Sequence, residues 1–149
     1  MNKYINDSEY VDIVNDILNN KEFKKLKKYK HHGDNRMDHC IRVSYYSYKI
    51  AKKLKLRYKE IARAGLLHDF FFVNNQEISF FTRIKVLFNH PRLAVINSNR
   101  HFKITKLEES MILSHVFPIG VRLPVHIESW VLDLVDDYFS IYERIKKCR

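Results

Sequence analysis

Apolar residues recur at helical spacing through almost the whole chain, and this pattern restricts the fold more than any other feature of the sequence. Residues three and four positions apart lie on one face of an α-helix, so each such run predicts an amphipathic helix. Only 3 glycines and 3 prolines interrupt the 149 residues, which is too few for the many turns of an all-β domain. No useful run has the two-residue period of a strand. The sequence therefore predicts an all-α fold, a single-domain helical bundle.

Short polar connections divide residues 1–149 into predicted helices of one domain. A first helix over 7–28, interrupted near Asn19, is expected to pack against a core of roughly residues 31–143. The other predicted helices cover residues 35–54, 58–68, 77–88 and 91–102, then a stretch from a capping box at Thr105–Glu108 to Pro118, and finally 126–146. The last helix is expected to bury an apolar stripe of Ile127, Trp130, Val131, Leu134, Tyr138, Ile141 and Ile145.

Two neighbouring predicted helices carry small residues that would let them approach closely. The helix over 35–54 has a stripe of Cys40, Ser44, Ser47 and Ala51. The next helix contains Gly65, although glycine inside a helix costs up to about 1 kcal/mol relative to alanine. Because the connection between these helices is short, we expect antiparallel neighbours with a close contact at the glycine.

The chain is strongly basic. Its 27 lysines and arginines exceed its 17 acidic residues, which gives a net charge of +10. This balance suits anionic partners such as phosphate esters, nucleotides or nucleic acid. The alternative is that the lysines serve only solubility, since many of them fall on predicted solvent-facing helix surfaces.

Cysteine usage and the apolar runs indicate the compartment. The two cysteines are Cys40 and Cys148, and the second stands next to the last residue, so a structural disulfide is not expected. The first nine residues are polar and lack an apolar signal core. No apolar run approaches the roughly 18 residues needed to span a bilayer. We therefore expect a reduced, cytoplasmic protein with no membrane partner.

Residue types that bind metals occur in order along the chain. His68 and Asp69 are adjacent after a small apolar helix end, and both side chains are good ligands for a divalent metal. Neighbouring helical residues point about 100° apart, so this pair needs partners from elsewhere. His39 lies upstream, and three acidic residues of the last helix lie downstream: Asp133, Asp136 and Asp137. Spacing alone does not decide which of the three is the ligand.

The ordered set of a histidine, a His-Asp pair and a final aspartate resembles the HD-domain superfamily of metal-dependent phosphohydrolases. The resemblance covers roughly residues 31–143. It implies a helical bundle with His39, His68, Asp69 and a late aspartate at a metal centre. The run Leu134-Val135-Asp136 is similar to the apolar-apolar-Asp element of the family, which selects Asp136.

Two further histidines indicate which branch of the superfamily the chain resembles. His90 precedes Pro91 and His115 precedes Pro118, so we expect the first at a helix start and the second near a helix end. Histidines between the His-Asp pair and the last aspartate are typical of members that hold two metals. That resemblance implies Asp69 as the bridging ligand and His90 and His115 at the second metal. The alternative is that both histidines merely cap helices.

The resemblance also implies the chemistry. His68 and Asp69 would belong to the catalytic centre, where a metal-activated water attacks phosphorus. Arg36 and Arg42 flank the first histidine at i−3 and i+3 and are candidate phosphate contacts, since guanidinium binds phosphate by two parallel hydrogen bonds. His32 is a further candidate substrate residue. Several family members have a lysine or glutamate soon after the His-Asp pair, whereas Phe70–Asn74 follow here, as core or as a platform for a nucleobase.

The sequence therefore predicts a phosphomonoesterase or phosphodiesterase acting on a nucleotide or another small phosphorylated substrate. It is expected to use divalent metal ions, two in number, among which Fe, Mn, Zn, Mg and Ni are not distinguishable. The alternative function is a basic helical domain that binds nucleic acid, with a structural or degenerate metal site.

Overall fold

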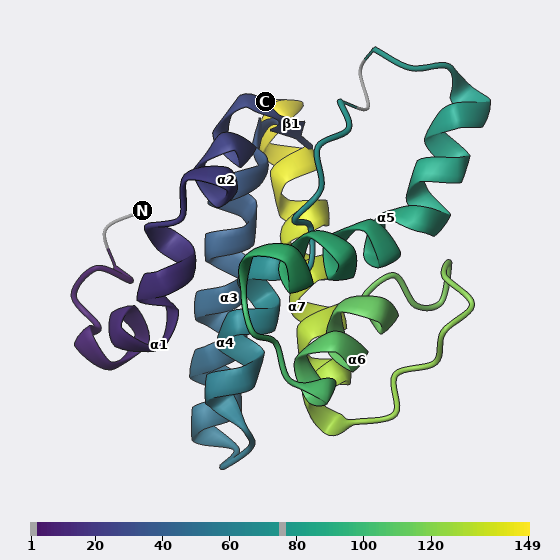
Figure 1. Cartoon of the computed structure of the whole chain (residues 1–149). Helices are drawn as coiled ribbons and strands as arrows, with labels where there is room; N and C mark the ends of the chain where they lie inside the picture. Colours follow the sequence, from purple (N-terminus) through teal and green to yellow (C-terminus); the bar gives the residue numbers. More distant parts are fainter. Residues whose placement is uncertain (1–2, 75–76) are drawn as a thin grey trace.

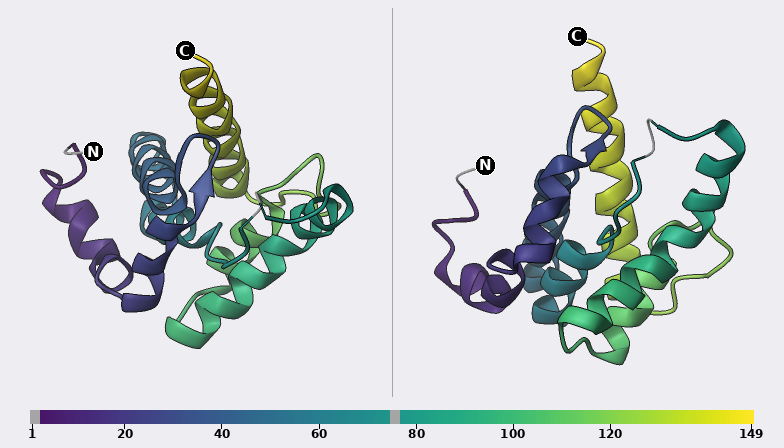
Figure 2. Two further views of the ribbon diagram at one scale, coloured as in Figure 1. Left: turned by 90° about the horizontal axis from the view of Figure 1, so that it is seen from above. Right: turned by 45° about the horizontal axis from the view of Figure 1, so that its top comes forward.

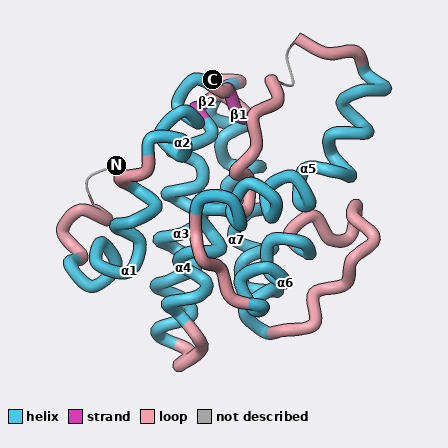
Figure 3. Tube along the Cα trace, viewed as in Figure 1, coloured by secondary structure: helices cyan, strands magenta, loops and turns pink. Residues whose placement is uncertain are grey.

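The computed structural model describes residues 3–74 and 77–149. Within them the chain is all-α apart from one very small hairpin, as predicted (Figure 3). The helices are α1 (Ser8–Leu18), α2 (Lys21–Lys24), a 3-10 turn (Lys25–Lys28), α3 (Arg36–Lys53), α4 (Tyr58–Leu67), α5 (Phe80–His101), α6 (Lys106–Ser114) and α7 (Ile127–Lys147). The antiparallel strands β1 (Lys30–His31) and β2 (Asp34–Asn35) precede α3.

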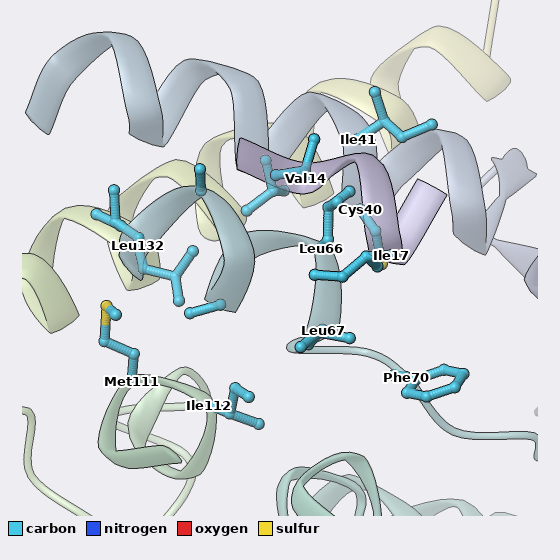
Figure 4. Close-up of a cluster of buried hydrophobic side chains, with 14 of the residues drawn as sticks. Val14, Ile17, Cys40, Ile41, Leu66, Leu67, Phe70, Met111, Ile112 and Leu132 are labelled. Carbon is cyan, nitrogen blue, oxygen red and sulfur yellow. The ribbon is translucent and has the colours of Figure 1, made fainter. Parts of the chain in front are cut away.

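Helix α4 lies at the centre of the bundle. It packs against α3 and α7, with α1 on one side and α5 and α6 on the other (Figure 1). The interior is one apolar cluster shared by these helices, and Figure 4 shows Val14, Leu66, Met111 and Leu132 within it. The bundle thus surrounds the C-terminal end of α4, where the His-Asp pair stands. No described helix is long and apolar enough to cross a membrane.

The close contact predicted at Gly65 is present between α3 and α4. A Cβ atom at this glycine would lie 2.5 Å from Cα of Ser44. The Ser44 hydroxyl donates a hydrogen bond of 2.6 Å to the carbonyl of Ala62, so the two backbones are held together. This contact brings the first half of α3, with His39 about one and a half turns before Ser44, against the end of α4.

Side chains that cap the first turn mark the starts of most helices. Asp7 accepts a hydrogen bond from the backbone N–H of Tyr10, and the capping box at Thr105 and Glu108 is formed. Asn35 caps α3, one residue later than expected. The predicted first helix is broken after Leu18 into α1, α2 and the 3-10 turn.

The predicted break at His90 was wrong. Helix α5 continues from Phe80 to His101 with Pro91 inside it, so His90 is a mid-helix residue. Proline removes one backbone hydrogen bond of a helix and leaves a carbonyl one turn earlier without its usual donor. Here that carbonyl belongs to Leu87, and it accepts a hydrogen bond of 3.0 Å from Nδ1 of His90. A side-chain donor therefore replaces the missing N–H.

The predicted buried face of α7 was also wrong. Most of the apolar stripe faces solvent: Leu134 is 61% exposed and Ile141 is 58% exposed. The buried side of the helix is mixed instead and includes Glu128, Ser129, Leu132, Asp133, Val135, Phe139 and Glu143. Apolar periodicity misleads here because the inner face of α7 supplies carboxylates to the interior.

Candidate metal centre

The six predicted ligands come together at one buried centre. His68 ends α4, and Asp69 follows it directly. His115 ends α6, whereas His90 comes from the middle of α5. The remaining two, His39 and Asp136, lie on the inner faces of α3 and α7. The bundle therefore collects ligand-type side chains from five separate helices or their ends.

One group of ligand atoms surrounds Asp136. Its Oδ1 atom lies 2.9 Å from Nε2 of His39 and 3.5 Å from Nε2 of His68. The three atoms are within 4.8 Å of one another, a spacing that can hold a metal ion. Both imidazole rings are fully buried, whereas the Asp136 side chain remains 14% exposed. Solvent therefore reaches this group from the side of the Asp136 carboxylate and not from the side of the two imidazole rings.

A second group surrounds the other aspartate. Oδ1 of Asp69 lies 3.2 Å from Nε2 of His90 and 3.5 Å from Nε2 of His115. Its Oδ2 atom faces the other way, 3.8 Å from Nε2 of His68. Since His68 also belongs to the first group, Asp69 stands between the two groups and can serve both.

Helix carbonyls fix the orientation of three of the histidines. His68, His90 and His115 each point Nδ1 at the carbonyl three residues earlier, at 2.7, 3.0 and 2.6 Å. A carbonyl only accepts, so Nδ1 carries the proton and Nε2 keeps a lone pair in the neutral ring. Two of these carbonyls are free because they lie at helix ends, and the third is free because of Pro91.

Glu143 plays the same part for the fourth histidine. Its carboxylate accepts from Nδ1 of His39, with both oxygens at 3.0 Å. A carboxylate behind a histidine is the usual support for a metal-binding imidazole, because it fixes the tautomer and makes the free nitrogen a stronger ligand. All four histidines thus present Nε2 to the interior of the centre.

The ligand atoms of this centre converge without hydrogen atoms between them when the rings are neutral. Nε2 of His90 lies 2.9 Å from Nε2 of His115, so two lone pairs face each other when both rings are neutral. Among the described residues, Nε2 of His68 is buried without a hydrogen-bond partner. Converging lone pairs and carboxylate oxygens are stabilised by a cation, and the donor set of imidazole and carboxylate fits a divalent transition metal. The residues present therefore fit a metal ion.

Neighbouring charges shift the pKa values of the side chains in this centre. Burial alone would lower the pKa of His68, but the charges of Asp69 and Asp136 raise it to about 9. In turn, burial would raise the pKa of both carboxyls, yet the charge of His68 holds each well below its usual range. Burial lowers the pKa of His115, which keeps that ring neutral. A metal ion would displace the proton of His68.

A further histidine, His31, was not predicted to be part of the centre. It stands on β1, and its Nε2 lies 3.2 Å from Oδ2 of Asp69. Its ring lies 4.0 Å from that of His39, and the ligand atoms of these two residues and Asp69 form another group that can hold a metal. Its side chain is 13% exposed, so it borders the open side of the centre. The His31-His32 doublet was a visible signal, but only the hairpin decides which of the two faces inward.

The three predicted substrate residues lie outside the buried cluster of ligand atoms. Arg36 is fully buried and donates to the carbonyls of Phe71 and Val73, which ties the segment after the His-Asp pair to α3. Arg42 binds Glu143 and Asp34 and is partly exposed. His32 accepts a hydrogen bond from Arg144, and burial and nearby cations lower its pKa to about 4. Of the two arginines, only Arg42 has a guanidinium group that solvent can reach.

The two other candidate aspartates of α7 are not among the groups of ligand atoms that can hold a metal. Asp133 is buried, its Oδ1 has no hydrogen-bond partner among the described residues, and burial with the charges of Asp137 and Asp136 raises its pKa to about 7. Asp137 is exposed. Of the three candidate aspartates, only Asp136 therefore lies among the ligand atoms, a choice that sequence spacing could not make.

A cleft of about 930 Å³ lies between α3 and α7, and it includes none of the six predicted ligands.

Comparison with protein-family models, with curated proteins and with solved structures finds no match for this chain. The interpretation of the centre rests on its own geometry.

Proposed function

We propose that this protein is a metal-dependent phosphohydrolase of the HD type, which cleaves a phosphate ester of a nucleotide or another small molecule. One observation carries the proposal: four imidazoles direct Nε2 toward two buried carboxylates, and each Nδ1 is held by a carbonyl or a carboxylate. A structural histidine cluster has no need to orient every ring in this way. Orientation of every donor is typical of a centre built to bind metal.

Two metal ions fit the two groups of ligand atoms better than one. His39, His68 and Asp136 would hold the first ion. His90 and His115, whose Nε2 atoms lie 3.2 and 3.5 Å from Oδ1 of Asp69, would hold the second. Asp69 would bridge them, since its two oxygens face different groups. Bound divalent ions supply positive charge that activates water and polarises a phosphoryl oxygen.

The chain itself contributes orientation, exclusion of water and an entry side. Glu143 holds His39 in one tautomer, and the bundle buries the rings so that bulk water does not compete for the ligand atoms. The partly exposed side chains of Asp136 and His31 mark the side from which a phosphate would enter. Arg42 is partly exposed and binds Glu143, the carboxylate behind His39, and it is the proposed phosphate contact; the same prediction for the buried Arg36 finds no support in its position.

Metal analysis of the purified protein, combined with a panel of phosphomonoester and phosphodiester substrates, tests this function. We expect up to two metal ions per chain and hydrolysis that stops on chelation and returns with metal. Asp69→Ala should abolish turnover and lower metal content while helicity is retained. Asp137→Ala, an exposed acid on α7, is the matched control and should behave like wild type.

The number of metal ions is tested separately. His115→Ala should halve the metal content and leave the group around Asp136 occupied. A wild-type protein that saturates at one ion per chain in metal excess would contradict the two-metal arrangement. Unchanged turnover in Asp69→Ala would contradict the proposed mechanism, in which Asp69 belongs to the metal centre.

Nucleic-acid binding is the second candidate function, and the net charge of +10 favours it. Such binding should weaken steeply with salt, because released counterions drive it. Binding of an oligonucleotide that Asp69→Ala leaves intact, together with no hydrolysis of any substrate in the panel, would favour this alternative.

A further inference from the structure

The first half of α5 leaves the helical body and exposes an apolar face (Figure 1). At 100° per residue, its five large apolar side chains fall within an arc of about 120°. They are Phe80, Phe81, Ile84, Leu87 and Phe88, and the first two are 71% and 77% exposed. The second half of the same helix buries Pro91, Ala94 and Val95 against the bundle. Among the described residues, only the second half of α5 therefore has its apolar side chains packed against the rest of the bundle.

The connection between α6 and α7 extends this surface. Figures 1 and 2 show it beside the first half of α5 in each view. Its apolar side chains point to solvent: Val121 is 98% exposed and Val125 is 71% exposed, with Ile119 and Leu123 also exposed. Both segments start at the metal centre, because α5 runs outward from His90 and the connection follows His115.

The charged side chains within the two segments have one sign, and the acid that lies nearest in the sequence is Glu77, three residues before Phe80. Arg83 and Lys85 fall at the two edges of the apolar arc of α5, and Arg92 and Arg122 lie nearby in the sequence. No aspartate or glutamate occurs between residues 78 and 107 or between 110 and 127. In the part of the chain that the structure describes, none of these four cations forms an ion pair. The surface is therefore apolar in the middle and cationic at its edges.

We propose that this surface, residues 80–88 of α5 together with residues 119–125, docks on a membrane that contains anionic lipids. Exposed aromatic and aliphatic side chains enter the boundary between headgroups and acyl chains, while flanking lysines and arginines contact lipid phosphates. A helix of this kind lies on the membrane and does not span it. The sequence-based expectation of no membrane partner considered spanning segments only.

Charge complementarity selects this occupant over two others. A second copy of the chain would present the same unpaired cations, so two such surfaces would repel each other. Nucleic acid would satisfy the cations but would leave exposed valine, isoleucine and leucine side chains in water. Anionic lipid satisfies both parts of the surface. Docking would bring the His90 and His115 side of the metal centre close to the lipid, and the inference holds whether or not the centre is an enzyme.

Co-sedimentation of the full-length protein with vesicles tests the proposal. The probe is phosphatidylglycerol mixed with phosphatidylcholine, compared with phosphatidylcholine alone, at low and high salt. We expect binding to the anionic vesicles that falls with salt, and at least about tenfold weaker binding to neutral ones, since each cation near an anionic surface contributes about fivefold. Phe80→Ser with Phe81→Ser should weaken binding at least about tenfold. Both side chains are largely exposed, so the fold should be retained.

Two control variants make the test specific. Leu134→Ser with Ile141→Ser removes exposed apolar side chains from α7, and Lys49→Glu with Lys53→Glu reverses exposed cations on α3. The α7 variant should bind vesicles like wild type. The charge test is Lys85→Glu with Arg122→Glu, which reverses two cations of the proposed surface. The α3 variant, its control, should lose far less affinity for anionic vesicles than this test variant does. The proposal is overturned by no binding to anionic vesicles at low salt, or by equal losses in the α5 and α7 variants. It is also overturned if the protein is a dimer that the Phe80 and Phe81 changes dissociate.

Discussion

At the residue scale, the centre depends on the hydrogen-bond acceptors that orient its histidines as much as on the candidate ligands. Three carbonyls and Glu143 each hold one Nδ1–H, and this leaves four Nε2 lone pairs for a cation. Pro91 belongs to this arrangement, because it frees the carbonyl of Leu87. A proline inside a helix costs roughly 3 kcal/mol, so its presence in α5 is explained by the histidine beside it.

Loss of Glu143 should weaken metal binding although this residue is not a predicted ligand. Glu143→Ala removes the acceptor that orients His39, and changes of this kind typically cost 10–100-fold in metal affinity. Titration of the metal-free protein with Zn²⁺ in a competing chelator measures the effect. Asp137→Ala removes an exposed acid from the same helix and should leave the affinity unchanged. Equal affinity in the two variants would show that His39 does not need its carboxylate.

Asp133 should make stability fall with rising pH. Its folded pKa is raised to about 7, whereas an unfolded aspartate titrates near 3.9, so the unfolded chain releases its proton first. Stability from this group is therefore present below pH 4 and is lost as pH rises toward 7. Asp133→Asn keeps the shape without the charge and should be more stable than wild type by about 2–4 kcal/mol at pH 8. The difference should shrink toward pH 4 in urea unfolding of metal-free protein, and a constant difference would contradict the raised pKa.

At the element scale, the position of the centre depends on how closely α3 and α4 approach. These helices carry His39 and His68, and their rings lie 5.4 Å apart. The backbone contact at Gly65 sets this spacing, because any Cβ atom there would overlap the backbone of Ser44. The glycine therefore serves the site as well as the core.

Gly65→Ala should destabilise the protein although alanine favours helix. The gain of up to about 1 kcal/mol in helix propensity is smaller than the cost of forcing two backbones apart, which is typically 1–3 kcal/mol or more. We expect a lower free energy of unfolding and weaker metal binding in the same variant. Gly120→Ala is the matched control, since its Cβ would meet only side-chain and backbone atoms of Val116 at 3.3 Å or more. A Gly65→Ala protein as stable as wild type would mean that the helices can separate without loss.

The sequence predicted the helices well and indicated which histidines and aspartates would come together, but it predicted the buried faces of the helices less well. Helix-period patterns located α3, α4, α6 and α7, and the order of histidines and aspartates indicated six residues that the fold brings together. The inner face of α7 was missed because its buried carboxylates interrupt the apolar pattern that marks a core. The continuity of α5 through Pro91 was missed because a side chain of the same helix compensates the lost hydrogen bond. His31 was missed because strand pairing over two residues has no periodic signal.

At the scale of the whole molecule, the centre joins nearly every part of the fold. Its candidate ligands come from α3, the end of α4, α5, the end of α6 and α7, and β1 adds His31. These parts meet at a buried cluster of carboxylates and imidazoles. A bound ion would join helices that otherwise touch mainly through the apolar core on one side.

Metal binding should therefore stabilise the entire bundle. A ligand at 100 times its Kd adds about 2.7 kcal/mol, which in a domain of this size raises Tm by roughly 5–10 °C. Thermal unfolding followed by circular dichroism, with chelator and with Mn²⁺ or Zn²⁺, measures the increment. Asp69→Ala should lose most of it, whereas His126→Ala, a histidine outside the centre, should retain it. Equal Tm values with metal and with chelator in wild type would contradict a metal centre.

The size of this increment should depend on pH in a defined direction. His68 has a folded pKa of about 9, above the 6.5 of an unfolded histidine, so its proton stabilises the metal-free fold below pH 6.5 and this contribution is lost as pH rises to 9. The metal-bound form needs the neutral ring, so proton and metal compete throughout that range. Both effects act in the same direction, and the rise in Tm caused by metal should grow from pH 6.5 to 9. An increment that is independent of pH over this range would mean that His68 is not a ligand, since a histidine must lose its proton to bind the metal.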